Sequence, residues 1–159
     1  MAPRGNIYVE TTVFSYLAAR PSRDLRVAAH QQVTAEWWDS RRHEFELFIS
    51  QLVVEEASAG DPGAASRRGE YLEDLTLLEL STIALALTER LLGDGAVPTA
   101  ATEDALHIAV AAVHGMQYLM TWNCKHIANA ATRSRIEVVC NEAGYDMPVI
   151  CTPEELLEE

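Results

Sequence analysis

The sequence predicts an α/β fold of three layers, in which a central, mainly parallel sheet is flanked by helices. Short apolar runs typical of strands alternate along the chain with longer stretches whose apolar residues recur at helical spacing. Strong turn signals separate them, such as Gly-Asp-Pro-Gly at 60–63. Strands that alternate with helices form βαβ units, and the strands of such units run parallel.

The expected strands are short, apolar and followed by polar or turn residues. The first one ends at a polar Glu-Thr-Thr step, after which apolar residues resume at helical spacing. A strand, a tight turn and a helix are therefore expected at the start of the chain. The five expected strands cover residues 6–9, 46–50, 77–80, 117–121 and 147–151.

The expected helices carry recognisable start and stop signals. Ser81 is the expected N-cap of a helix that runs to residue 92, and Pro98 opens another helix that closes at Gly115. This second helix is apolar nearly all round, so it should be buried on most sides. Thr152 and Glu155 form a capping box for a short terminal helix. One further helix is expected directly after the first strand. The remaining expected helices cover residues 24–43, 53–57, 64–73 and 132–143.

Length and composition indicate one globular domain spanning residues 1–159. A chain of 159 residues, 48% of them hydrophobic, buries roughly two thirds of its unfolded surface and needs no disulfide or structural metal. No apolar run approaches the roughly 18 residues of a membrane span. The N-terminal segment has no signal-peptide pattern, so we expect a cytoplasmic protein without a membrane partner.

Cysteine pattern and charge narrow the function classes. Cys124, Cys140 and Cys151 are odd in number and contain no C-x-x-C pair, which argues against a disulfide framework or a thiolate zinc site and predicts buried thiols. The formal net charge is −12, whereas phosphate binding usually draws on clustered Lys and Arg. The net charge neither supports nor excludes RNA as a ligand. It does predict weak non-specific binding of nucleic acid and some dependence on a basic partner.

Acids and an amide stand near the ends of several expected strands. Glu10 follows the first strand, Glu55 and Glu56 lie one turn into the helix after the second, and Asn123 follows the fourth. Asp104 opens the apolar helix. Ligands of open α/β sheets gather at the carboxyl ends of the strands, and clustered carboxylates repel unless a cation neutralises them. Oxygen ligands favour Mg²⁺ or Mn²⁺.

Each of these residues also has a purely structural explanation. Glu10 fits a solvated turn, Asn123 fits a turn or cap, and acids at a helix start are favoured by the helix dipole alone. His107 and His114 share a helix face but lie roughly 10 Å apart along its axis, so one zinc ion cannot bind both. We expect His107 to be a hydrogen-bonded core residue or an outer partner of the metal ligands. Loops of the P-loop, dinucleotide-binding and serine-hydrolase types are missing from the sequence.

Four ordered motifs resemble those of PIN domains, most closely the VapC-like toxins. They are IYVETTVF at 7–14, ISQLVVEE at 49–56, DALHIA at 104–109 and YLMTWNCKH at 118–126. The resemblance implies a central parallel sheet and an acidic pocket that binds one or two divalent ions, Mg²⁺ or Mn²⁺. It also implies endonucleolytic cleavage of RNA, as by the toxin of a toxin–antitoxin pair.

Carried over residue by residue, the resemblance places the first acid on Glu10. The second acid falls best on Glu56, with Glu55 as the alternate register, the third falls on Asp104, and the fourth falls on Asn123. Two departures stand out, because Glu10 replaces the usual Asp and Asn123 removes a negative charge. Both are expected to weaken metal affinity or to change which ion binds.

The implied catalytic set is Glu10, Glu56, Asp104 and Asn123, the first three as metal ligands. Metal-activated water would attack the phosphate and leave a 5′-phosphate and a 3′-hydroxyl. Thr12 and Thr121 are expected to bind the substrate beside the acids, and candidates for phosphate contacts are Arg20, Arg23, Arg26 and Lys125. The expected partners are an RNA substrate, an antitoxin protein and a second copy of the chain. The alternatives are a catalytically weak PIN-like module that binds RNA or protein, and a small-molecule phosphohydrolase.

Overall fold

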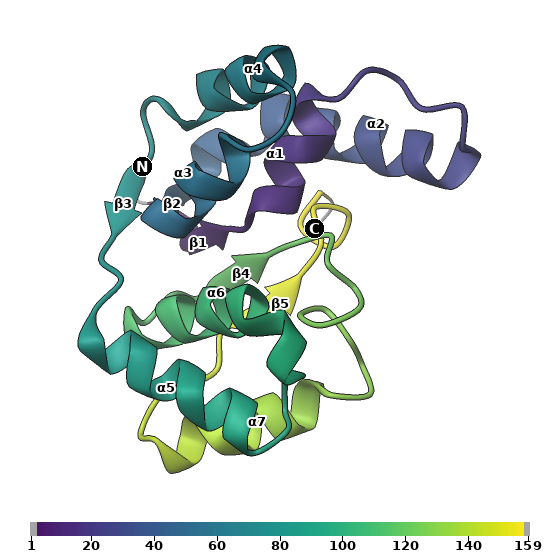
Figure 1. Cartoon of the computed structure of the whole chain (residues 1–159). Helices are drawn as coiled ribbons and strands as arrows, with labels where there is room; N and C mark the ends of the chain where they lie inside the picture. The colour runs from purple at the N-terminus through teal and green to yellow at the C-terminus, as the bar shows by residue number, and fades with distance from the viewer. Residues whose placement is uncertain (1–2, 158–159) are drawn as a thin grey trace.

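The computed structural model describes residues 3–157 and contains, within that range, a five-stranded sheet with every pair of neighbouring strands parallel (Figure 1). The strand order is β3-β2-β1-β4-β5, so β1 lies at the centre of the sheet. The predicted three-layer α/β architecture with a mainly parallel sheet is confirmed. The strands are β1 (Asn6–Val9), β2 (Glu46–Ser50), β3 (Thr76–Leu78), β4 (Tyr118–Met120) and β5 (Val149–Cys151).

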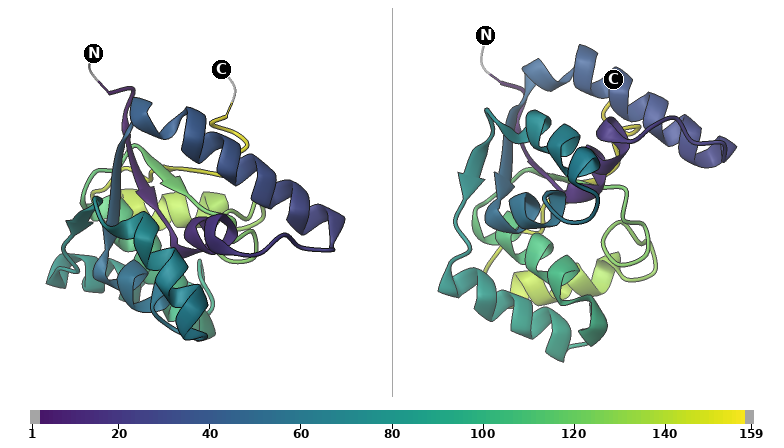
Figure 2. Two further views of the ribbon diagram at one scale, coloured as in Figure 1. Left: turned by 90° about the horizontal axis from the view of Figure 1, so that it is seen from above. Right: turned by 45° about the horizontal axis from the view of Figure 1, so that its top comes forward.

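Helices cover both faces of this sheet. Figure 1 shows one group above the sheet and a second group below it, and Figure 2 shows the same layers from two other directions. The first group comprises α1 (Thr11–Ala18), α2 (Leu25–Ser40), α3 (Gln51–Ala57) and α4 (Pro62–Leu72), with a 3₁₀ turn, η1 (Arg42–Glu44), after α2. The second comprises α5 (Thr82–Gly93), the 3₁₀ turn η2 (Thr99–Ala101), α6 (Thr102–Val113) and α7 (Arg133–Glu142).

Local signals fix several helix ends. The Ser81 hydroxyl accepts a hydrogen bond from the Ala84 amide, which confirms Ser81 as the N-cap of α5. Asp24 caps α2 by accepting from the two amides of residues 26 and 27. Gly115 follows α6 with a φ of 68°, a left-handed conformation that glycine adopts without strain. The chain is thereby turned directly into β4.

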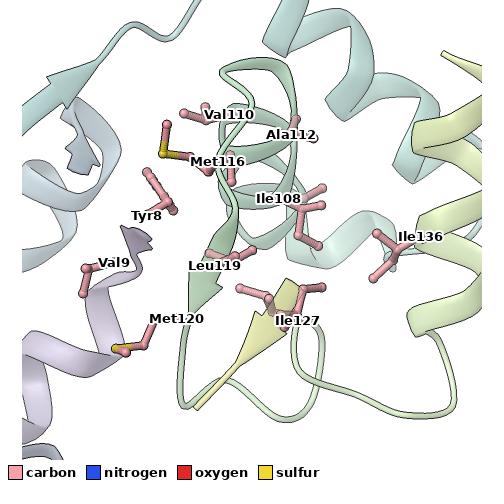
Figure 3. Packing of buried hydrophobic residues seen from close by; sticks show 14 of the residues in the cluster. Tyr8, Val9, Ile108, Val110, Ala112, Met116, Leu119, Met120, Ile127 and Ile136 are labelled. Carbon is pink, nitrogen blue, oxygen red and sulfur yellow. The ribbon is translucent and has the colours of Figure 1, made fainter. Parts of the chain in front are cut away.

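The apolar helix α6 lies in the core, as its composition predicted. Ile108 and Ala111 are fully buried, and α6 packs beside β4 and close to Tyr8 of β1 (Figure 3). Ala105, the residue after Asp104, is also fully buried, so packing against the core extends into the first turn of α6. The helix therefore carries both Asp104 and His107 in fixed directions.

Two expectations about individual segments are wrong. Residues 153–157 form consecutive turns with hydrogen bonds from residue i+3 to residue i, so no helix begins at Pro153 in the part of the chain that is described. Five described residues are too few to sustain a helix by themselves, and Leu156 and Leu157 pack against the core. Cys124 is exposed because it lies in the turn after β4, whereas Cys140 and Cys151 are buried as expected.

Burial raises the pKa of the Cys140 thiol to about 11 and that of Cys151 to about 12. Both thiols therefore stay protonated near neutral pH. Among residues 3–157, no helix has the length and apolar character needed to cross a membrane.

Candidate metal centre

Three ligand-bearing side chains converge at the carboxyl edge of the sheet. Glu10 directly follows β1, Glu56 lies in the second turn of α3, and His107 lies in α6. One carboxylate oxygen of each glutamate and one ring nitrogen of His107 lie within 4.8 Å of one another. Within residues 3–157, no Lys or Arg side chain forms an ion pair with either glutamate. The arrangement can therefore accept a cation.

Glu10 is held by two threonine hydroxyls. Its side chain is only 4% exposed, and its Oε1 accepts hydrogen bonds of 2.5 Å from Thr12 and from Thr121. Each hydroxyl oxygen already accepts a backbone amide, from Trp122 for Thr12 and from Asn123 for Thr121. The single proton of each hydroxyl is thus directed at the carboxylate. The other oxygen of Glu10, Oε2, receives no hydrogen bond from the described residues.

The segment after β4 is anchored to α2 through an aromatic stack. The ring of Trp122 stacks on His30 with centroids 4.1 Å apart and an angle of 15° between the planes. Its Nε1 donates to the hydroxyl of Thr34, which is fully buried, over 2.8 Å. The stack and the hydrogen bond together fix Trp122. Its backbone amide can therefore position the hydroxyl of Thr12, and the adjacent Thr121 is positioned to donate to Glu10.

Glu56 is oriented by two donors. Its Oε1 accepts from the hydroxyl of Thr11 at 2.5 Å and lies 2.6 Å from Nε2 of His107. Burial acts to raise the pKa of Glu56, but the hydrogen bond and charge of His107, with the hydrogen bond of Thr11, outweigh it and leave the pKa below its ordinary value. The adjacent Glu55 is exposed. Of the two registers that the sequence left open, only Glu56 faces the cluster.

His107 ends a chain of buried polar groups. Its Nδ1 lies 2.7 Å from the hydroxyl of Tyr8, which lies 2.7 Å from the hydroxyl of Ser50 at the end of β2. His107, Tyr8 and Ser50 are all fully buried, and burial strongly raises the pKa of Tyr8. The prediction that His107 is a hydrogen-bonded histidine of the core is confirmed. His114 bonds the backbone oxygen of Glu79 instead and takes no part in the cluster.

Asp104 and Asn123 meet at a second histidine. The Oδ2 of Asp104 lies 2.9 Å from Nδ1 of His126, and the Oδ1 of Asn123 accepts the backbone amide of His126 at 3.0 Å. Asn123 thus stabilises the turn after β4. Asp104 lies one helical turn before His107 on the same side of α6, but it is not a member of the three-residue cluster.

The basic side chains predicted to contact phosphate are exposed on the surface of the molecule. Arg20 and Arg23 are exposed on the connection between α1 and α2, which Figure 2 shows reaching away from the sheet. Arg26 is exposed in the first turn of α2, and Lys125 is exposed in the turn after β4. Their contact with a phosphate stays a prediction.

Sequence reasoning did not assign Thr11, Tyr8, Ser50 or His126 to the site. The hydroxyl next to Thr12 and the histidine three residues after Asn123 carried no distinguishing pattern, because their roles depend on side-chain directions. In comparisons with known proteins, no family, curated protein or solved structure matches the chain.

Proposed function

We propose that the protein is a divalent-metal-dependent endoribonuclease that resembles PIN domains, with its ion held at Glu10 and Glu56. The observation that carries the proposal is the meeting of two carboxylates from separate elements within 4.8 Å, at the carboxyl edge of a parallel sheet. Four motifs in the order typical of PIN domains contribute the residues that surround this point.

The residues fit a hard cation. Two carboxylates this close repel each other strongly unless a positive charge lies between them. Glu10 turns one fully bonded oxygen toward the threonines and leaves Oε2 without a hydrogen bond from the described residues. Asp104 adds a third negative charge one turn before His107. Carboxylate oxygens of this kind suit Mg²⁺ or Mn²⁺.

The protein's own contribution to catalysis is rigidity and charge. A divalent ion bound at this edge would lower the pKa of a water molecule and offset the charge that develops on a phosphate. Thr12 and Thr121 fix the rotamer of Glu10, and Thr11 and His107 fix that of Glu56. Groups held in this way need no reorganisation during the reaction. The expected products carry a 5′-phosphate and a 3′-hydroxyl.

RNA is the proposed substrate because the order of the four motifs resembles that of PIN domains. The net charge of the chain does not add to this argument, because it provides no general attraction for a polyanion. At a formal net charge of −12, the protein should bind RNA weakly outside its target. Exposed cations at Arg20, Arg23 and Lys125 are the proposed phosphate contacts. A basic antitoxin-like protein remains the proposed partner.

A cleavage assay with matched variants tests the function. Wild type, Asp104→Asn and Glu10→Gln are incubated with end-labelled RNA, DNA and nucleoside monophosphates, each with Mg²⁺, with Mn²⁺ or with a chelator. We expect cleavage of RNA by wild type only when an ion is present, and a loss of at least about 100-fold in both variants. Glu55→Gln and Glu103→Gln change the charge by the same amount at exposed neighbours and should keep full activity.

The pattern of failure distinguishes the alternatives. Hydrolysis of nucleotides without RNA cleavage would replace the proposal with a small-molecule phosphohydrolase. RNA binding without cleavage under any ion would identify a catalytically weak binding module, for which the engagement of Asn123 with the backbone of His126 is the favouring observation. Full activity in Asp104→Asn would remove that residue from the site.

A further inference from the structure

We propose that His107 is itself a metal ligand, through Nε2, and that this nitrogen makes the site prefer Mn²⁺ over Mg²⁺. The inference rests on the metal centre of the proposed function and goes beyond it, because it adds a nitrogen donor to a set of oxygens. The three atoms that lie within 4.8 Å of one another are two carboxylate oxygens and one imidazole nitrogen.

The surroundings of His107 are those of a ligating histidine. Metal-bound histidines almost always use their second ring nitrogen in a hydrogen bond that fixes the orientation of the ring. Here Nδ1 lies 2.7 Å from the hydroxyl of Tyr8, and the ring is fully buried. Nε2 therefore has one fixed direction, toward Oε1 of Glu56, and it lies within 4.8 Å of a carboxylate oxygen of Glu10.

The hydrogen-bond chain behind the ring can reverse as a unit. Without an ion, a proton on Nε2 can be donated to Glu56, and Nδ1 then accepts from Tyr8, which accepts from Ser50. With an ion on Nε2, the ring proton resides on Nδ1 and is donated to Tyr8, which donates to Ser50. The hydroxyls of Tyr8 and Ser50 can each take either role. The three side chains carry the same number of protons in both arrangements.

The nitrogen donor determines the choice of ion. Mg²⁺ strongly prefers oxygen ligands, whereas imidazole is a good ligand for first-row transition ions. Among residues 3–157, the cluster contains two carboxylates and one imidazole. This ligand set is richer in oxygen than the Cys- and His-rich sites that usually hold zinc, so we expect Mn²⁺. One of the two carboxylates comes from Glu10, which stands where the resembled family usually has the shorter Asp.

Pulsed electron paramagnetic resonance of the Mn²⁺-loaded full chain tests this directly, because a coordinated imidazole nitrogen couples to the electron spin. We expect ¹⁴N coupling in wild type and its loss in His107→Gln. The matched control is His126→Gln, which alters the partly buried histidine beside Asp104 and should keep the coupling. This readout does not depend on activity.

Titration calorimetry measures the preference. His107→Gln should reduce the ratio of Mn²⁺ to Mg²⁺ affinity by about tenfold or more, since an amide oxygen replaces the nitrogen. Tyr8→Phe removes the partner of Nδ1 and should weaken Mn²⁺ binding by about 10- to 100-fold. Circular dichroism checks that each variant folds. If His107→Gln does not, the spectra of wild type and His126→Gln alone decide.

Each outcome has a separate meaning. Bound Mn²⁺ without nitrogen coupling in wild type overturns the role of His107 and leaves the carboxylate metal centre and the proposed function standing. Nitrogen coupling that survives His107→Gln but disappears in His126→Gln would assign the coordinated nitrogen to His126, beside Asp104. That result also overturns the role of His107. Failure of wild type to bind either ion overturns both the inference and the proposed function.

Discussion

Glu10→Gln should leave the protein at least as stable as wild type when a chelator removes divalent ions. The carboxylate oxygens of Glu10 and Glu56 in the cluster are no more than 4.8 Å apart. Two ionised carboxylates at this separation repel by about 3 kcal/mol at an effective dielectric constant of about 20. Glutamine removes this repulsion and keeps the shape of the side chain.

The opposing effect is smaller. The amide oxygen of glutamine still accepts from Thr12 and Thr121, but a hydrogen bond to a neutral group is weaker than one to a charge by about 1 kcal/mol, or about 2 kcal/mol for both. The net change is about 1 kcal/mol in favour of Glu10→Gln. For a chain of this length, it corresponds to a rise of about 2–4 °C in melting temperature.

Thermal melts in chelator measure the stability of the ion-free proteins, and melts in excess Mn²⁺ measure the stabilisation that the ion provides. At 100 times the dissociation constant, an ion that binds only the folded state stabilises wild type by about 2.7 kcal/mol, and Glu10→Gln should lose most of this gain. Thr121→Val is the matched control. It keeps the charge, removes one buried donor and should destabilise the ion-free protein by about 1–3 kcal/mol.

A Glu10→Gln protein that melts clearly below wild type in chelator would show that Glu10 is a structural hydrogen-bond acceptor. An undiminished rise in melting temperature with Mn²⁺ would separate Glu10 from the ion. Either result refutes the reasoning.

Further outcomes concern pH, thiol reactivity and association. Because the folded-state pKa of Glu56 lies below its ordinary value of 4.5, the contribution of Glu56 to stability is complete above that pH and is lost as the pH falls through the folded pKa. Ion-free wild type should therefore lose more stability than Glu56→Gln in acid melts, and parallel curves would contradict this. A thiol reagent at pH 8 should modify Cys124 alone in the native protein, since Cys140 and Cys151 are buried with raised pKa values, and rapid reaction of all three would oppose it. Light scattering should show a homodimer, and a monomer at all micromolar concentrations would exclude one.

The fold was accessible from sequence because its signals are local. The apolar run of β1, the cap at Ser81 and the apolar character of α6 each act over a few residues, and the βαβ alternation determines the direction of the strands. The terminal segment shows where such signals fail. A capping box at Thr152 specifies how a helix would begin, but the described residues after it form only turns with bonds from residue i+3 to residue i, because so short a segment does not sustain a helix.

The site was accessible only as a set of segments. Strand ends meet at one edge of a parallel sheet, so the neighbourhood of Glu10 and Glu56 followed from topology. The direction of each side chain did not. Adjacent helical residues differ by about 100° around the axis, which separates the exposed Glu55 from Glu56, and only packing determines which of the two faces the edge.

The same limit explains why the histidine is more informative than the acids. An acid at a helix start or strand end has a structural explanation within its own element, so its type alone is weak evidence. His107 has none, because a fully buried imidazole must be satisfied by partners from other elements, here Tyr8 of β1 and Glu56 of α3. An apolar residue would fill the same volume of α6 without requiring either partner. The buried ring thus depends on partners in two other elements, which is the arrangement expected if Nε2 is presented to an ion.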